Sequence, residues 1–109
     1  MEEPNPSSLA FLRAISNDKR LLIVQWLLNP AAHFPPQRDG DLVEDGVCLG
    51  AIVRKIELRQ PTVTGHLKIL VEAELVHSKP IKNWVFYRAD KAAITAAVSK
   101  LSTMLSPEQ

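Results

Sequence analysis

The chain has a single cysteine, Cys48, among its 109 residues. One cysteine cannot form a disulfide within the chain, so we expect a protein of the reducing cytoplasm. No apolar run reaches the length of a membrane span and the N-terminus carries no secretory signal, so we expect no membrane partner. The apolar fraction of 46% is typical of a folded protein, and the length favours a single domain over residues 1–109.

Catalytic patterns are also missing. The chain has four glycines, which form no glycine-rich phosphate-binding loop. No helical pattern carries a pair of histidines at metal-binding spacing, and no nucleophile stands at a recognisable spacing from a base. We therefore expect neither an enzyme nor a bound cofactor.

The net charge is only +1, which by itself argues weakly against contact with nucleic acid. The charges are nevertheless segregated along the chain. Acidic residues cluster just before residue 46, whereas residues 47–91 are mainly basic. A segregated basic face is what contact with phosphates requires. The acidic group is Asp39, Asp41, Glu44 and Asp45, and the basic group is Arg54, Lys55, Arg59, Lys68, Lys79, Lys82, Arg88 and Lys91.

Residues 47–75 predict a helix-turn-helix. Apolar side chains repeat at helical spacing from Leu49 to Ile56, and a tight connection follows near residues 56–59. A second helix begins at Gln60, with Pro61 in its first turn, where a missing N–H costs nothing. The apolar stripe of this second helix consists of Val63, Leu67, Leu70, Val71 and Leu75.

The opposite face of the second helix carries small polar side chains near its N-terminal end. Helical geometry places on that face Pro61, Thr62, Gly65, Lys68, Ile69 and Glu72, with Gln60, Thr64 and His66 at its flanks. Hydroxyl, amide and imidazole groups of this size can enter a major groove and exchange hydrogen bonds with base edges. An ordinary solvated face remains the alternative when this helix is taken alone.

Two helices and a long loop are predicted before this unit. Ser7 or Ser8 can cap the first helix, and Asn17 can cap a second that runs to about Leu28 and is apolar over a wide arc, so the two helices span residues 7–28. Residues 29–46 form an inserted loop. This loop is either structural or a contact for a ligand or partner.

A hairpin and a final helix are predicted after it. Residues 75–89 are rich in branched and aromatic side chains around a turn at residues 80–83, and this hairpin is called the wing below. Residues 90–105 predict an amphipathic helix whose apolar spacing suits pairing with another helix. Its apolar residues are Ile94, Ala97, Val98, Leu101 and Leu105.

Three segments together resemble the ArsR/SmtB family of winged helix-turn-helix repressors. They are residues 18–28, residues 58–76 and residues 84–88. Together they cover most of the chain from about Phe11 to Asp90. The resemblance implies a mainly α fold with a small β-hairpin that dimerises through its N- and C-terminal helices. It also implies a homodimer that binds double-stranded DNA. The inserted loop departs from the family, whose members usually cross this gap with fewer residues.

Many members of this family sense metals, and their ligand positions can be compared with this chain. One type of site uses a pair of cysteines near the start of the first helix of the helix-turn-helix, where only Cys48 stands. The other uses Asp, His and Glu on the C-terminal helix, which offers Asp90 but no histidine over residues 91–109. The histidines His33, His66 and His77 are scattered over the loop, the second helix and the wing. We therefore expect no metal site.

Cys48 has two interpretations. A helix N-terminus stabilises a thiolate, which would make Cys48 a possible redox switch. It is also a small side chain suited to burial, and without a second cysteine there is no resolving partner within the chain. The packing interpretation is favoured.

These observations predict a sequence-specific transcriptional regulator. We expect a homodimeric repressor that reads a palindromic operator with two recognition helices about 34 Å apart. The alternative is a winged-helix module for protein association that does not read DNA, and the inducing signal cannot be read from the sequence. The predicted DNA contacts are Gln60, Thr62, Thr64 and His66 near the bases, Gly65 for close backbone approach, Arg59 and Lys68 near phosphates, and Lys79 and Lys82 on the wing.

Overall fold

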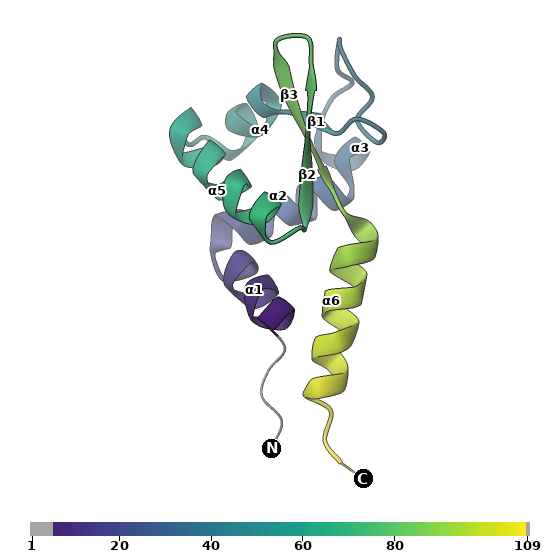
Figure 1. The fold of residues 1–109 in the computed structure, drawn as a ribbon. Coiled ribbons are helices and arrows are strands. Elements are labelled where there is room, and N and C mark those ends of the chain that lie inside the picture. The colour runs from purple at the N-terminus through teal and green to yellow at the C-terminus, as the bar shows by residue number, and fades with distance from the viewer. Residues whose placement is uncertain (1–5, 109) are drawn as a thin grey trace.

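The structure, a computed structural model, describes residues 6–108 as a bundle of helices with a three-stranded antiparallel sheet (Figure 1). The predicted class, mainly α with a β-hairpin wing, is confirmed. None of the helices in this described range is long and apolar enough to cross a bilayer. The elements are α1 Pro6–Ile15, α2 Asp18–Leu28, α3 Pro30–His33, β1 Val47–Cys48, α4 Leu49–Ile56, α5 Gln60–Glu72, β2 Val76–Ile81, β3 Trp84–Ala89 and α6 Lys91–Met104.

Helix α2 provides the centre of the core. Its side chains Ile23, Val24, Trp26 and Leu27 are buried. The side-chain oxygen of Asn17 accepts hydrogen bonds from the backbone N–H groups of two residues in the first turn, at 2.9 and 3.1 Å. This satisfies two donors that the helix itself cannot pair, and the predicted cap at Asn17 is confirmed.

The predicted cap of the first helix is wrong. Helix α1 begins at Pro6, so Ser7 and Ser8 lie inside its first turn and not before it. Ser8 is buried, and its Oγ donates a weak hydrogen bond to Sδ of Met104 at 3.7 Å. The side chain therefore links α1 to the end of α6, a long-range contact that local sequence does not reveal.

The sheet has the strand order β1-β3-β2. The two-residue strand β1, which the sequence did not indicate, pairs with β3 through Val47 and Tyr87. The expected turn at residues 80–83 is too long, because Pro80 and Ile81 belong to β2 and the turn consists of Lys82 and Asn83. Pro80 is tolerated because β2 is an edge strand.

The inserted loop is attached to the body at several points. Phe34 is buried and meets the Trp26 ring edge-on, with ring centroids 6.1 Å apart, and Leu42 packs against the core. Gln37 donates to the backbone oxygen of Gly46 at 2.9 Å and accepts from the N–H of Cys48 at 2.8 Å. These contacts favour the structural interpretation of the loop for this part of its length.

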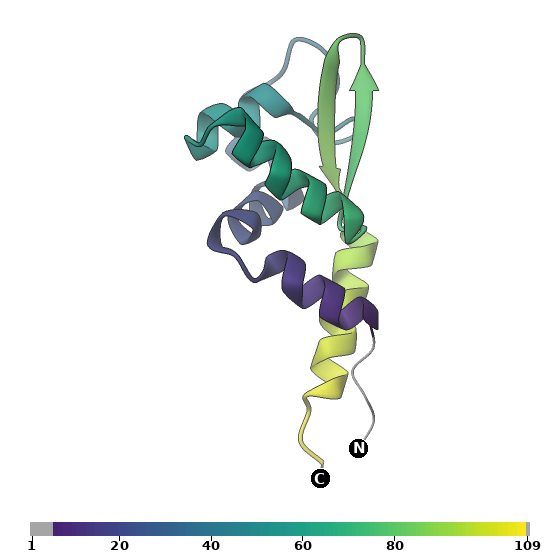
Figure 2. The same ribbon diagram turned by 60° about the vertical axis from the view of Figure 1, so that its left-hand side comes forward.

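The molecule is elongated, with principal extents of 52 × 24 × 21 Å. The wing lies at one end, and α6 extends away from the body toward the other end, where α1 lies beside it in both views (Figures 1 and 2). Helix α5 crosses the front of the second view with its outer side uncovered (Figure 2). The fold thus separates an end suited to pairing from the face that carries α5.

Candidate nucleic-acid interface

The tight connection between α4 and α5 fixes the start of α5. Helix α4 ends at Ile56, and its C-cap residue Glu57 adopts a left-handed conformation with φ of 57° and donates its N–H to the carbonyl of Val53 at 3.0 Å. Arg59 occupies the N-cap position, and α5 begins at Gln60 with Pro61 in its first turn. The sequence predicted this start and this proline position, and both are confirmed.

One face of α5 is sealed into the core. Val63, Leu67 and Leu70 have no exposed surface. Val71 is half-buried and Leu75, just beyond the helix, is 3% exposed. The predicted apolar stripe is confirmed, and it determines which side of α5 faces outward.

The outward side of α5 carries most of the predicted DNA-contacting residues. Gln60, Thr62, Thr64 and Lys68 are exposed, and so is Arg59 at the N-cap. A Cβ atom built at Gly65 would meet no atom within 4 Å, so the backbone is open to solvent there. The structure therefore brings these side chains onto one accessible surface, which is called the α5 face below.

His66 is the exception among the predicted base contacts. It is half-buried, and its Nδ1 lies 3.2 Å from a guanidinium nitrogen of Arg20 on α2. Because a guanidinium only donates hydrogen bonds, Nδ1 must accept, which requires the neutral imidazole with its proton on Nε2. His66 thus faces the scaffold through one nitrogen, and its predicted contact with a base could use only the other.

Arg20 is a central residue that the sequence analysis did not single out. Its Nε donates to the carbonyl of Ala14 at 2.6 Å, and its Nη2 lies 3.3 Å from the carbonyl of Arg13. These carbonyls lie in the last turn of α1 and lack partners within the helix. One side chain of α2 thereby holds the end of α1 and His66 on α5. In the sequence Arg20 is the last of three consecutive charged residues at the start of α2, and nothing distinguishes it from Asp18 and Lys19.

The two predicted contact lysines on the wing are engaged by the inserted loop. Lys79 Nζ lies 2.5 Å from Asp45 Oδ1, and Lys82 Nζ lies 3.1 Å from Asp39 Oδ1. The hydrogen bond from Lys79 is the largest cause of the lowered pKa of Asp45. Both lysine side chains remain more than half exposed, at 57% and 70%, so these ion pairs are weak and open to competition.

Two of the residues considered for sensing, His77 and Asp90, form a pair, and the described residues add no third ligand to it. Cys48 is half-buried at the N-cap position of α4. Asp90 caps α6 by accepting from the N–H of Ala93 at 2.9 Å and lies 2.7 Å from His77 Nε2, whose hydrogen bond is the main cause of the lowered pKa of Asp90. Within residues 6–108, no group of three or more His, Cys, Asp and Glu side chains is placed to hold a metal ion.

A helix-turn-helix with an open polar face and a β-hairpin beside it is the architecture of winged helix-turn-helix DNA-binding proteins. Solved structures support this class. HlyU from Vibrio cholerae superposes with a TM-score of 0.66 over 96% of this chain and 98% of its own, at 24% identity. NolR from Sinorhizobium fredii gives 0.60 over 99% and 100%, at 23% identity. The repressor BigR from Xylella fastidiosa gives 0.59 over 92% and 87%, at 23% identity.

Sequence similarity identifies the family within this class. The model of the ArsR family of bacterial regulatory proteins matches residues 42–78. YbzH of Bacillus subtilis, an uncharacterized HTH-type transcriptional regulator, is 36% identical over 91 residues, which are 84% of this chain and 91% of the relative. The chain belongs to the ArsR family and is a DNA-binding transcriptional regulator. Of the two functions that the sequence left open, the regulator is supported.

The environment of His66 generates a pH-dependent prediction. Burial first, and the neighbouring charge of Arg20 second, lower the pKa of His66 below its ordinary value of 6.5, while Asp18 acts in the opposite sense. Below pH 6.5 the unfolded chain therefore binds a proton that the folded chain does not. The contribution of His66 to the free energy of unfolding should be at its full value above pH 6.5. It should be lost as the pH falls from 6.5 through the lowered pKa of His66.

Urea unfolding on both sides of pH 6.5 measures this loss. His66→Gln should flatten the pH dependence in that window, because glutamine does not titrate. His33→Gln, at an exposed position on α3, is the control and should leave the dependence unchanged. Identical pH profiles for the wild type and His66→Gln would contradict the assignment.

Proposed function

We propose that the protein is a homodimeric repressor that reads a palindromic operator with α5 in the major groove. The observation that carries this proposal is the division of α5 into a sealed face and the α5 face. The small side chains of Gln60, Thr62 and Thr64 can approach base edges, and the uncovered backbone at Gly65 allows close contact with the duplex. Family membership supports DNA as the partner.

Charged side chains around the α5 face are suited to phosphates. Arg59 and Lys68 flank the small polar residues, and both are exposed. Lys82 lies in the turn of the wing, and Lys79 lies farther along β2. Phosphate contacts of this kind set the position of a protein on the duplex, while base contacts provide discrimination.

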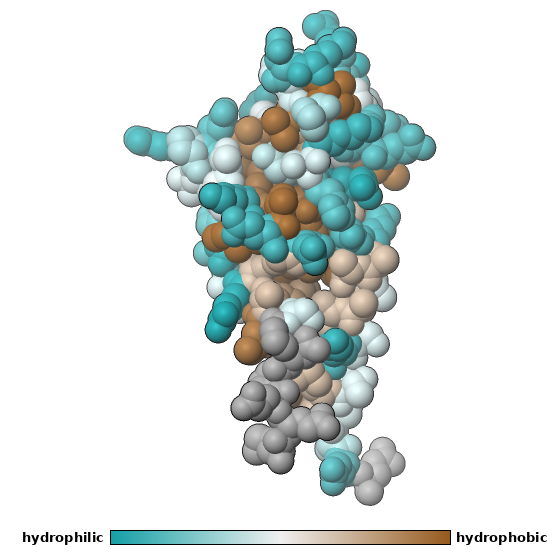
Figure 3. Space-filling model, viewed as in Figure 1, coloured by the Kyte–Doolittle hydropathy of each residue, from teal (hydrophilic) through white to brown (hydrophobic). Residues whose placement is uncertain are grey.

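Dimerisation is supported by apolar side chains left exposed on the terminal helices. Val98, Met104 and Leu105 on or just after α6 are 52%, 43% and 77% exposed, and Leu12 on α1 is 38% exposed. Figure 3 shows weakly apolar surface along α6, mixed with hydrophilic patches, below a wing end that is mainly hydrophilic. A second copy packed on this surface would bury these side chains and present two α5 helices to one duplex.

The proposal also includes that the protein acts as a repressor and that it works in the cytoplasm. BigR, a structural neighbour, is described as a transcriptional repressor. A repressor acts by occupying its operator, and it works in the cytoplasm, where bacterial DNA lies. The proposal includes no metal sensing, because Cys48 is the single cysteine and α6 contains no histidine.

Gln60→Ala tests base readout. A site selected from random DNA or from the gene's own upstream region would be compared with random duplex. The substitution should cost about 1–3 kcal/mol on the selected site and relax discrimination there, because a base contact is lost. Glu72→Ala, at the far end of the same helix, is the control. Equal losses on selected and random DNA would refute the contact.

Lys82→Ala tests the phosphate contact of the wing. It should weaken binding to all sequences alike and reduce the slope of log affinity against log salt by about one. Asp39→Asn should have the opposite effect, a gain of about twofold to fivefold, because Lys82 loses its competing partner. Glu44→Gln removes a carboxylate of the same loop that forms no ion pair with a described residue, and it should gain less. A salt slope unchanged in Lys82→Ala contradicts the contact.

Val98→Glu tests the dimer interface. A charge introduced there should shift the protein to a monomer in sedimentation experiments, because an unpaired carboxylate would be buried between copies. Ser99→Glu adds the same charge about 100° farther round α6 and should leave the dimer intact. If the wild type itself sediments as a monomer, the helix-pairing arrangement is wrong.

A further inference from the structure

We propose that a cavity between the inserted loop, α4 and β3 is an effector pocket for a small planar carboxylate. The cavity has a volume of about 290 Å³, at the lower end of the range for small-molecule sites. Its chemistry is set by Arg38, Cys48, Gly50, Arg54 and Trp84. These residues come from the inserted loop, β1, α4 and β3, which meet beside the helix-turn-helix.

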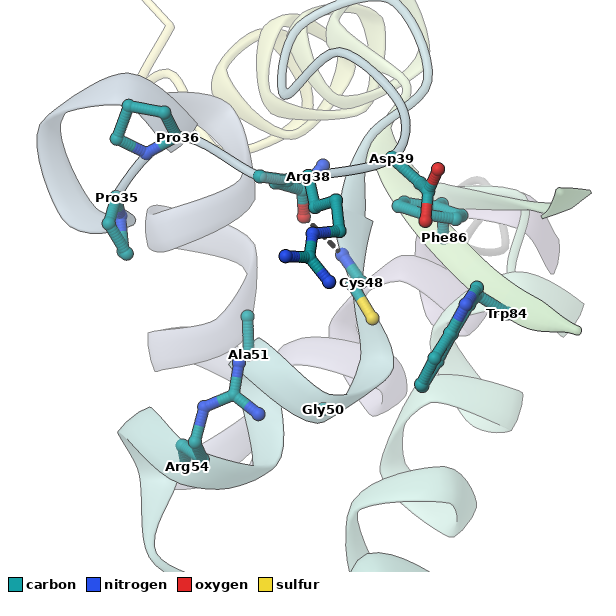
Figure 4. A pocket seen from close by; sticks show the side chains of 11 residues that line it. Pro35, Pro36, Arg38, Asp39, Cys48, Gly50, Ala51, Arg54, Trp84 and Phe86 are labelled. Carbon is teal, nitrogen blue, oxygen red and sulfur yellow. Dashed lines mark hydrogen bonds between the residues drawn. The ribbon is translucent and has the colours of Figure 1, made fainter. Parts of the chain in front are cut away.

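Two arginines give the pocket a positive charge. The guanidinium groups of Arg38 and Arg54 both point into the space between the loop and α4 (Figure 4). Neither forms an ion pair with a carboxylate of residues 6–108. The acid that lines the pocket, Asp39, is already paired with Lys82. Two uncompensated guanidinium groups, each with a forked set of donors, favour a carboxylate ligand.

Gly50 keeps the space beneath these arginines open. A Cβ atom built there would lie 3.2 Å from Nη1 of Arg54 and 4.0 Å from Sγ of Cys48. The guanidinium of Arg54 thus passes over bare backbone at the start of α4. A larger residue at this position would compete with the arginine for the space that the ligand's acid group needs.

The far side of the pocket is aromatic. Trp84 is 53% exposed, an unusual state for so large an apolar side chain, and it lies across the pocket from the arginines with Cys48 between them (Figure 4). Phe86 and the rings of Pro35 and Pro36 add apolar lining. A planar ligand could therefore stack its body on Trp84 while its carboxylate meets the arginines. This largely apolar lining suits a singly charged carboxylate better than a phosphate.

The pocket is connected to the DNA-binding parts, and this half of the inference rests on the proposed function. Its walls belong to α4, to β3 of the wing and to the loop that holds the wing lysines. Asp39 both lines the pocket and pairs with Lys82. A ligand that ties Arg38 to Arg54 and stacks on Trp84 would fix the loop against α4 and β3 and keep Lys82 on Asp39. Ligand binding would then lower DNA affinity, as an inducer does.

Benzoate is a suitable probe for the binding half, with benzamide as its neutral counterpart. Nuclear magnetic resonance can follow the indole N–H signals of the two tryptophans, and a Trp84→Phe variant assigns them. Benzoate should shift the signal of Trp84 saturably and leave that of the buried Trp26 in place. Arg38→Gln and Arg54→Gln should each weaken binding about tenfold, because each removes charged hydrogen bonds. Arg13→Gln, on α1, is the matched control.

Three results would overturn the pocket. They are the absence of a saturable change at Trp84, equal binding of benzamide and benzoate, and arginine variants that bind benzoate as Arg13→Gln does. All of these variants change exposed side chains, and circular dichroism would verify that each is folded.

DNA affinity measured with and without saturating benzoate tests the effector role. The affinity should fall in the wild type and stay constant in Lys82→Ala, which keeps every residue of the pocket but has no lysine for Asp39 to hold. An unchanged affinity in the wild type overturns the effector role. A protein that binds no DNA under any condition overturns the proposed function instead, and the titration of Trp84 still decides the pocket.

Discussion

The complete burial of Val63, Leu67 and Leu70 is the constraint on which the recognition unit depends. These side chains fix the rotation of α5 about its own axis, because turning the helix by one residue would swing them about 100° out of the core. Removing a side chain of this kind from a packed core typically costs about 2–5 kcal/mol, so alternative rotations are strongly disfavoured. The position of Gln60 and Thr62 on the outside therefore follows from packing on the inside.

Arg20 extends this constraint to the rest of the scaffold. It binds the carbonyls of Ala14 and Arg13 and the imidazole of His66, so the end of α1 and the middle of α5 are held by one group. Since α1 also contacts α6 through Ser8 and Met104, the recognition helix is coupled to the helices proposed to form the dimer. In such an arrangement, the distance between two recognition helices is set by rigid packing and not by a flexible linker.

Local signals in the sequence were sufficient for much of this fold. The side chain of Asn17, the proline after Gln60 and the apolar stripe of α5 act on their own neighbours, and their predictions were confirmed. The missed features join distant segments: β1 is a strand because it pairs with β3, and Ser8 of α1 donates a hydrogen bond to Met104 at the end of α6. For the candidate site, the sequence predicted which side chains α5 exposes, except for His66, which is half-buried against Arg20. It could not reveal that Asp39 and Asp45 lie against the wing, because no local pattern links residues more than thirty positions apart.

The ion pairs of Asp39 with Lys82 and of Asp45 with Lys79 offer a physical reason for the low net charge of this DNA-binding protein, which is only +1. Lysine contacts with phosphate supply affinity for every sequence equally and therefore do not discriminate between sites. Two acidic residues of the inserted loop, Asp39 and Asp45, pair with the wing lysines, whereas among the described residues no ion pair engages Arg59 or Lys68 at α5. If the wing lysines contact phosphates as proposed, the loop would weaken binding to random DNA without touching the exposed polar side chains of α5. In this proposal the acidic loop and the small polar side chains of α5 both favour discrimination between sites. The loop would lower the affinity for phosphates, so a larger share of the binding free energy would come from contacts that depend on sequence.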